Sequence, residues 1–217
     1  MFFEYGEKEI ACLKSKDKTL GAAIDAIGHI ERTVDTDLFS SIIRHIIGQQ
    51  ISAAAQKTIW ERITRKIGAI TADAVNGLSV DEIQQFGTTF RKAAYIKDFA
   101  RKIESGKFAP DDMRGKSDSE IVARLSAVKG IGVWTAEMIL IFCLQRPDIF
   151  SYTDLAIHRG LRMLYRHETI DKQKFEQYRL AFSPHCTVAS LYIWAVAGRA
   201  LGGMKEYAPK KKPVSGA

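Results

Sequence analysis

The stretch AVKGIGVWTAEMIL, residues 127–140, contains two glycines where one helical pattern ends and another begins. The preceding segment SDSEIVARLSAVK places apolar residues at helical spacing, and the following segment VWTAEMILIFCL is almost wholly apolar. Glycine within a helix costs roughly 0.5–1 kcal/mol relative to alanine, so the sequence GIG at 130–132 marks a sharp connection. We therefore predict a helix, a tight glycine hairpin and a second helix.

Helical patterns also cover most of the remaining chain. They predict helices at about 20–30, 37–63, 72–78, 80–86, 91–104, 154–166, 171–182 and 187–200. Gly48-Gln49-Gln50 interrupts the second of these and predicts a turn, and Ser117-Asp-Ser-Glu120 is a capping box that opens the helix before the hairpin. No alternating run of β-branched residues is long enough for a sheet. The predicted fold class is all-α.

The composition indicates a globular protein with an anionic partner. Its 217 residues carry a net charge of +7, which favours nucleic acid, although a merely basic soluble protein has the same charge. The three cysteines are widely spaced without a C-x-x-C pair, so neither a disulfide framework nor a zinc or iron–sulfur site is expected. The N-terminus shows no signal peptide, and the longest apolar run, MILIFCL, is too short to span a bilayer. We therefore expect a cytoplasmic protein, nucleoid-associated if bacterial or archaeal, with no membrane partner.

The glycine hairpin has the features of an anion site. Backbone N–H groups at the start of a helix point outward, and the helix dipole favours negative charge there. A double-stranded nucleic acid backbone, contacted without sequence preference, suits such a site, and Lys129 adds a positive charge at its edge. A plain interhelical turn with glycine caps explains the same two glycines, so this short pattern leaves both interpretations open.

The longer pattern L-x-x-V-K-G-I-G-V-W-T-A, residues 125–136, resembles the helix-hairpin-helix element of the DNA glycosylase superfamily. In that family a loop and an aspartate follow the element, and here Asp154 lies 22 residues beyond Gly132, in IFSYTDLAIHRGLRML. The upstream segment FSSIIRHIIGQQIS resembles the family's early helix and DNA-probing loop. The resemblance extends from about residue 13 to 203, and it is greatest to the alkylpurine branch, 3-methyladenine DNA glycosylase II.

The resemblance implies a two-lobed all-α fold with a cleft between the lobes. We expect residues 33–146 to form one lobe, a helical bundle with the probing loop and the hairpin, and residues 1–32 with 147–204 to form the other. Trp134 and Asp154 would lie in the cleft. The family often has an additional N-terminal β-rich domain, for which this chain is too short, and the basic tail at 205–217 is expected to be disordered.

The resemblance assigns catalysis to Asp154. Hydrolysis of an N-glycosidic bond builds positive charge on the sugar as the base departs, and one ionised carboxylate can stabilise that charge and orient or deprotonate the attacking water. Aspartate is also a favoured helix N-cap, which by itself explains a position at a helix start. The family often has proline and a second acid just before the aspartate, whereas this chain has Ser151-Tyr152-Thr153, so the pose of the approach loop is left open.

The base pocket is expected to contain aromatic rings, because an alkylated purine is a cation that such rings attract, at roughly 0.5–2 kcal/mol per contact. Trp134 matches a pocket tryptophan of the alkylpurine branch, with core packing as the alternative. His185 falls where relatives carry another pocket aromatic, with a capping or surface role as alternatives, and Tyr152 and Phe39 are further candidates. Trp134 also replaces the lysine nucleophile of strand-cutting relatives, and the four-cysteine cluster of the endonuclease branch is absent. Both departures predict a monofunctional enzyme without lyase activity.

The resemblance also implies a set of DNA contacts. Gln50, with Gln49 beside it, matches the residue that fills the gap left by a flipped base, although both glutamines could instead cap helix ends. The hairpin resembles ones that hold a structural Na+ or K+ through main-chain carbonyls, and no catalytic metal or other cofactor is implied. The carbonyls that match are those of Ser126, Val128 and Ile131. The expected DNA backbone-binding residues are Lys129, Gly130, Ile131, Gly132 and Thr135.

These features together predict excision of alkylated purines, of the 3-methyladenine and 7-methylguanine class, from double-stranded DNA. The enzyme would act as a monomer that flips the damaged base during base excision repair. Two alternatives remain: a related glycosylase for deaminated or mismatched bases, and a DNA-damage binding protein without catalysis. Asp154 argues against the second, because binding alone gains nothing from an anion that faces DNA.

Overall fold

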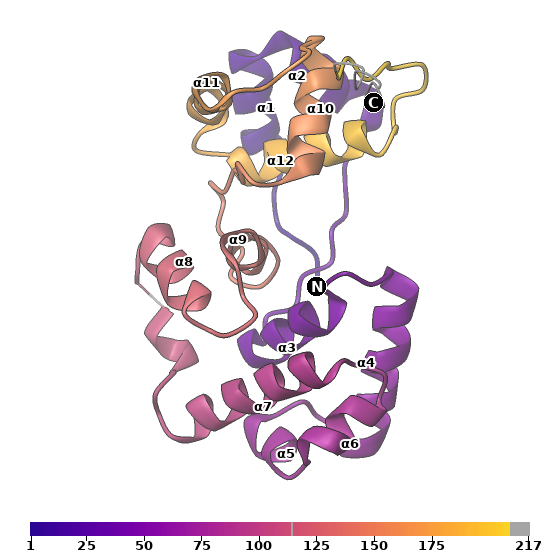
Figure 1. Cartoon of the computed structure of the whole chain (residues 1–217). Coiled ribbons are helices and arrows are strands. Elements are labelled where there is room, and N and C mark those ends of the chain that lie inside the picture. The colour runs from indigo at the N-terminus through magenta and orange to yellow at the C-terminus, as the bar shows by residue number, and fades with distance from the viewer. Residues whose placement is uncertain (114, 209–217) are drawn as a thin grey trace, which may run out of the picture. The chain divides into compact units, whose positions relative to one another are not determined.

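The computed structural model describes residues 1–113 and 115–208, which form twelve α-helices and one short 3₁₀ helix, with no β-strand among them (Figure 1). This confirms the predicted all-α fold class. The chain divides into two compact units: unit 1 contains Met1 and Thr33–Gln145, and unit 2 contains Phe2–Arg32 and Arg146–Ala217. Residues 209–217, most of the tail expected to be disordered, lie outside the described residues.

Unit 1 is a helical bundle that contains both the GQQ turn (residues 48–50) and the glycine hairpin (residues 128–132). Its helices are α3 (Leu38–Gly48), α4 (Ala53–Ile67), α5 (Ala72–Asn76), α6 (Val80–Gln85), α7 (Phe90–Glu104), the 3₁₀ helix Pro110–Met113, α8 (Asp118–Ser126) and α9 (Val133–Phe142). α3 packs on both α7 and α9. The end of α3, which forms the turn, and the start of α9, which follows the hairpin, therefore belong to one packed body.

Hydroxyl side chains determine where many helices of unit 1 begin. The Ser52 hydroxyl accepts a hydrogen bond from the Ala55 N–H at the start of α4, and Thr89 caps α7 in the same way. Ser117 and Glu120 form the predicted capping box at the start of α8. Hydrogen bonds from the hydroxyl and N–H of Ser117 lower the pKa of Glu120. The box fixes how the chain enters the helix that leads to the hairpin.

Unit 2 is built around the apolar helix α12 (Cys186–Ala197), most of whose side chains are buried. Around it lie α1 (Glu7–Lys16), α2 (Lys18–Ile27), α10 (Leu155–Tyr165) and α11 (Lys172–Phe182). α10 crosses α12 (Figure 1), and the two backbones approach so closely that a Cβ at Gly160 would collide with the Ile193 carbonyl. This contact fixes α10, and with it Asp154 at its N-terminus.

The structure adds one helix that was not predicted and moves several predicted helix ends. α1 was not expected, because its sequence EKEIACLKSK buries only Leu13; contacts with α2, α11 and α12 stabilise it in unit 2. α2 ends at Ile27 rather than near residue 30, since Gly28 has a φ of +79° that does not continue a helix. α12 likewise stops at Ala197, before Gly198. Residues with positive φ, Gly28 after α2 and Arg199 after α12, end both helices earlier than apolar periodicity alone indicated.

Among residues 1–113 and 115–208, no single helix has the length and apolar content needed to cross a bilayer. Only α11 and α12 taken together meet the length and composition criteria, and a bend of 119° separates them.

Candidate functional site

In the hairpin between α8 and α9, glycine is required for steric reasons at position 130 but not at position 132. Gly130 has a φ of +88°, and a Cβ there would lie 2.6 Å from the Tyr95 ring. Gly132 has an ordinary φ of −92°, and a Cβ there would meet nothing within 4 Å. The hydrogen bond from the Ile131 N–H to the Val128 carbonyl, 3.0 Å long, closes the turn. Gly132 therefore leaves open space at the start of α9 that the fold itself does not require.

The start of α9 presents backbone N–H groups rather than polar side chains. No side chain caps this helix, and its first internal hydrogen bond runs from Ala136 to the Gly132 carbonyl. Thr135 is only 6% exposed, so we expect any contact with DNA to come from its N–H. Lys129 is exposed, and its ammonium lies 3.7 Å from Asp98. These groups have the charge and geometry of a phosphate site.

The two adjacent glutamines of the GQQ turn have different surroundings. Gln49 is half-buried and donates its side-chain amide to the Gly130 carbonyl in the hairpin. Gln50 is exposed and has a φ of +57°, an uncommon conformation for a residue other than glycine. The contact of Gln49 with the hairpin leaves Gln50 as the better candidate for entering the DNA stack.

Asp154 is the N-cap of α10 and is 5% exposed. Its Oδ1 accepts hydrogen bonds from the Ala156 and Ile157 N–H groups, at 2.8 and 2.9 Å. The carboxylate is therefore held in one orientation at the positive end of a helix dipole, which favours negative charge. A capping role does not exclude a catalytic role, because capping holds the carboxylate in a fixed orientation without consuming its charge.

An aromatic platform supports the loop that leads to Asp154. His158 donates its Nε2–H to the Tyr152 carbonyl at 2.6 Å. The Tyr152 ring, 41% exposed, meets His158 and Phe175 edge-on, with centroids 5.2 and 5.0 Å apart. His158 and Phe175 are stacked at 5.5 Å. The sequence prediction missed both supporting residues; His158 stands one helical turn after Asp154, which is the only signal that could have identified it.

The remaining aromatic candidates have different surroundings. Trp134, in the first turn of α9, is 44% exposed, which core packing alone does not require. Phe39 is 7% exposed and stacks on Phe99 with centroids 5.4 Å apart. This packing buries most of the Phe39 ring against the core of unit 1. His185 is half-buried at the N-cap position of α12 and makes no side-chain cap bond.

Leu155 is an exposed residue beside Asp154 that the sequence prediction also missed. It is the first residue of α10 and 84% exposed, whereas most leucines of the fold are buried. No local pattern marks it, because an apolar residue at a helix start usually faces a core.

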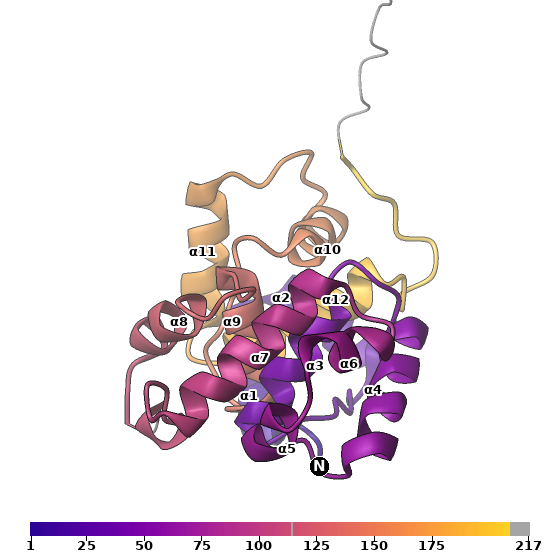
Figure 2. The same cartoon turned by 60° about the horizontal axis from the view of Figure 1, so that its bottom comes forward.

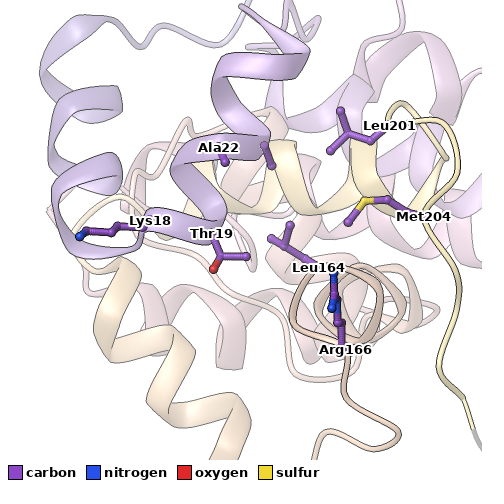
Figure 3. Close-up of a pocket in the computed structure, with 8 residues that line it drawn as sticks. Lys18, Thr19, Ala22, Leu164, Arg166, Leu201 and Met204 are labelled. Carbon is purple, nitrogen blue, oxygen red and sulfur yellow. The ribbon is translucent and has the colours of Figure 1, made fainter.

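Two other features do not supply the chemistry. A cavity of about 460 Å³ in unit 2 contains none of the predicted site residues. Figure 3 shows Thr19, Leu164, Leu201 and Met204 turned toward it, while Lys18 extends away. Cys143 and Cys186 are buried, and burial raises the pKa of Cys143 to about 12 and also raises that of Cys186. Neither buried thiol provides a nucleophile at neutral pH.

A family model described as HhH-GPD superfamily base excision DNA repair protein matches residues 43–184, a range that includes the GQQ turn, the hairpin and Asp154. The chain belongs to this superfamily. Membership confirms the predicted family.

Similar proteins place the chain in the 3-methyladenine DNA glycosylase branch of the HhH-GPD superfamily. DNA-3-methyladenine glycosylase 1 of Schizosaccharomyces pombe is 30% identical over 72% of this chain and 71% of its own length. The crystal structure of a DNA-3-methyladenine glycosidase from Bacillus halodurans is 29% identical, with a TM-score of 0.83 over 95% of this chain and 97% of that one. A Schizosaccharomyces pombe 3-methyladenine DNA glycosylase (Mag1) in complex with abasic-DNA is 25% identical, with a TM-score of 0.78 over 92% of this chain and 100% of that one. The chain spans 59% of the length of the Bacillus subtilis relative YfjP, to which it is 26% identical.

Proposed function

We propose that this protein is a monofunctional DNA glycosylase that hydrolyses the N-glycosidic bond of alkylated purines in double-stranded DNA. The observation that carries the proposal is the Asp154 carboxylate, which is buried and oriented by two backbone N–H groups at the start of α10. The same chain has the glycine hairpin, whose free N–H groups suit a phosphate. Relatives named for 3-methyladenine support the alkylpurine class.

In the proposed reaction, Asp154 acts on the sugar after the damaged base has left the stack. As the N-glycosidic bond breaks, the sugar acquires positive charge and the carboxylate stabilises it. Asp154 also orients or deprotonates the water that attacks the anomeric carbon. A purine alkylated at a ring nitrogen departs as a neutral base, so a separate general acid is not needed. The products are the free base and an abasic site.

The proposed selectivity comes from aromatic rings that attract a cationic base. Trp134 and Tyr152 are 44% and 41% exposed, which leaves ring surface for a ligand. A ring in contact with a cation contributes roughly 0.5–2 kcal/mol that a neutral purine does not receive. His158 and Phe175 would hold the Tyr152 ring in place. We propose Gln50 as the residue that fills the gap opposite the unpaired base.

A monovalent cation fits the hairpin as a structural group. The Ser126 hydroxyl is a buried oxygen with no hydrogen-bond partner among the described residues, and it belongs to the same segment as the carbonyls of Val128 and Ile131. The Val128 carbonyl accepts one hydrogen bond, from Ile131, and retains a second lone pair. Na+ or K+ bound to the main-chain carbonyls of Ser126, Val128 and Ile131 would supply positive charge beside a phosphate.

Incubation with duplex DNA treated with a methylating agent tests the proposed function. We expect release of 3-methyladenine and 7-methylguanine, identified by chromatography, while duplexes containing hypoxanthine or a mismatched base are left unchanged. Release of hypoxanthine alone would reassign the enzyme to deaminated purines. Specific binding to damaged DNA without release of any base would show a binding protein instead.

The proposed enzyme should leave the DNA strand intact, because Trp134 stands where a Schiff-base lysine would be needed. Product DNA is expected to break only after alkali or heat. Treatment with borohydride during the reaction should trap no covalent protein–DNA adduct. A trapped adduct on a denaturing gel would contradict this prediction.

Lys129→Ala measures whether the edge of the hairpin contacts a phosphate. Lys129 is exposed and paired only loosely, at 3.7 Å, with Asp98. If it neutralises one phosphate, its removal should reduce the slope of log affinity against log salt by at most about one unit, and by the same amount on every sequence. Binding of undamaged duplex at several salt concentrations gives the slope. An unchanged slope would remove Lys129 from the proposed contacts.

A further inference from the structure

One face of α7 contacts both proposed DNA-binding elements of unit 1. Lys92, Tyr95 and Asp98 follow each other at intervals of three residues, so their side chains lie on the same side of the helix. In Figure 2, α7 passes in front of α3, on which it packs. Each of the three side chains contacts either the GQQ turn or the hairpin.

Lys92 holds the GQQ turn. Its ammonium donates hydrogen bonds to the Ile47 carbonyl at 2.9 Å and to the Gln49 carbonyl at 2.6 Å. These carbonyls lie at the C-terminal end of α3, where the helix dipole favours a cation. Burial, and secondly the charge of Arg91, lower the pKa of Lys92. Keeping a charged ammonium at this position therefore costs free energy.

Tyr95 and Asp98 hold the hairpin. The Tyr95 ring lies where a Cβ of residue 130 would be, so glycine at that position lets the hairpin rest directly on α7. Asp98 lies 3.7 Å from the Lys129 ammonium at the edge of the same hairpin. The position of the hairpin is thus set by the helix that also carries Lys92.

Gln49 joins the two elements directly. Its backbone carbonyl accepts from Lys92, and its side-chain amide donates to the Gly130 carbonyl, 81 residues further along the chain. The exposed Gln50 therefore follows a residue that is fixed at both its backbone and its side chain. Since Gln50 has a left-handed φ of +57°, its conformation depends on these neighbours.

We propose that Lys92 and Gln49 are positioning residues that couple the GQQ turn to the hairpin, so that anchoring a phosphate at the hairpin places Gln50 in register with the DNA stack. Neither residue touches the reacting atoms. The inference rests on the proposed function for the roles of Gln50 and the hairpin, while the coupling itself is a property of the free protein.

The first experiment measures the coupling without DNA, by amide hydrogen exchange in wild type, Lys92→Met, Gln49→Ala and Lys57→Met. Lys57 lies on α4 and is exposed, so its variant is a matched control for loss of a lysine charge. Coupling predicts exchange about tenfold faster in both the 48–51 and 128–132 segments for Lys92→Met and for Gln49→Ala, and wild-type exchange for Lys57→Met. Faster exchange confined to 48–51 in both variants would overturn the proposal.

The second experiment measures single-turnover base release in a double-mutant cycle of Lys92→Met and Gln50→Ala. If Lys92 acts by positioning Gln50, each single variant slows release by about tenfold and the double variant is no slower than the slower single variant. If the rate losses of the two single variants multiply in the double variant, as a general loss of stability would also cause, the proposal is overturned. If wild type releases no base, the proposed function fails, and the exchange experiment still decides the coupling.

Discussion

Asp154→Asn is expected to slow single-turnover release of alkylated purines by about 10²–10⁴-fold, with no loss of folding stability. The structure separates these effects, because an asparagine oxygen can accept the same bonds from the Ala156 and Ile157 N–H groups and so preserve the helix cap. The substitution removes the negative charge of the side chain. Binding to DNA with an abasic site should be unchanged or tighter, since an anion near phosphate has been removed.

Asp171→Asn provides a matched control in the same unit. Asp171 is the N-cap of α11 and accepts from the Lys174 N–H at 2.8 Å, so the substitution removes a capping charge without affecting the proposed chemistry. Its rate of base release should equal that of wild type. Asp154→Ala should additionally lose about 0.5–2 kcal/mol of stability with the cap. Near-wild-type release by Asp154→Asn would exclude the proposed mechanism.

Gly132→Asn is expected to weaken binding to every duplex by about tenfold while leaving the protein folded, because hydrogen bonds to a charged phosphate are lost. The φ of −92° and the open space at Gly132 accept a side chain, and asparagine is a better N-cap than glycine. Its side-chain oxygen would bond to N–H groups at the start of α9 that the phosphate is proposed to use. Duplex affinity and thermal unfolding, measured together, check both parts.

Gly130→Ala should instead destabilise the fold. A φ of +88° and a Cβ 2.6 Å from Tyr95 make any side chain there strained, so we expect a loss of about 1–3 kcal/mol in the free energy of unfolding. The two glycines of one hairpin would thus separate a requirement of folding from a requirement of binding. Unchanged DNA binding by Gly132→Asn, or a loss confined to one sequence context, would show that the hairpin is not a general phosphate anchor.

The amino-acid sequence by itself determined the all-α class, the hairpin between α8 and α9, the turn after α3 and the helix that Asp154 opens. These features follow from interactions between residues a few positions apart: apolar periodicity, the Ser117–Glu120 box and glycines that stop helices. The resemblance of three such motifs to one superfamily supplied the family, which the match over residues 43–184 confirmed.

Only the tertiary structure decided which candidate side chains are available for function. Phe39 and Trp134 are both aromatic residues near helix starts, yet Phe99 covers the first and the second is 44% exposed. Gln49 and Gln50 are neighbours, yet one is bonded to Gly130 and the other is exposed. The burial of Phe39 and the bond of Gln49 each depend on a partner tens of residues away in the chain, brought close by helix packing. Local sequence patterns contain no information about such partners, because periodicity and capping report only on contacts within one or two helical turns.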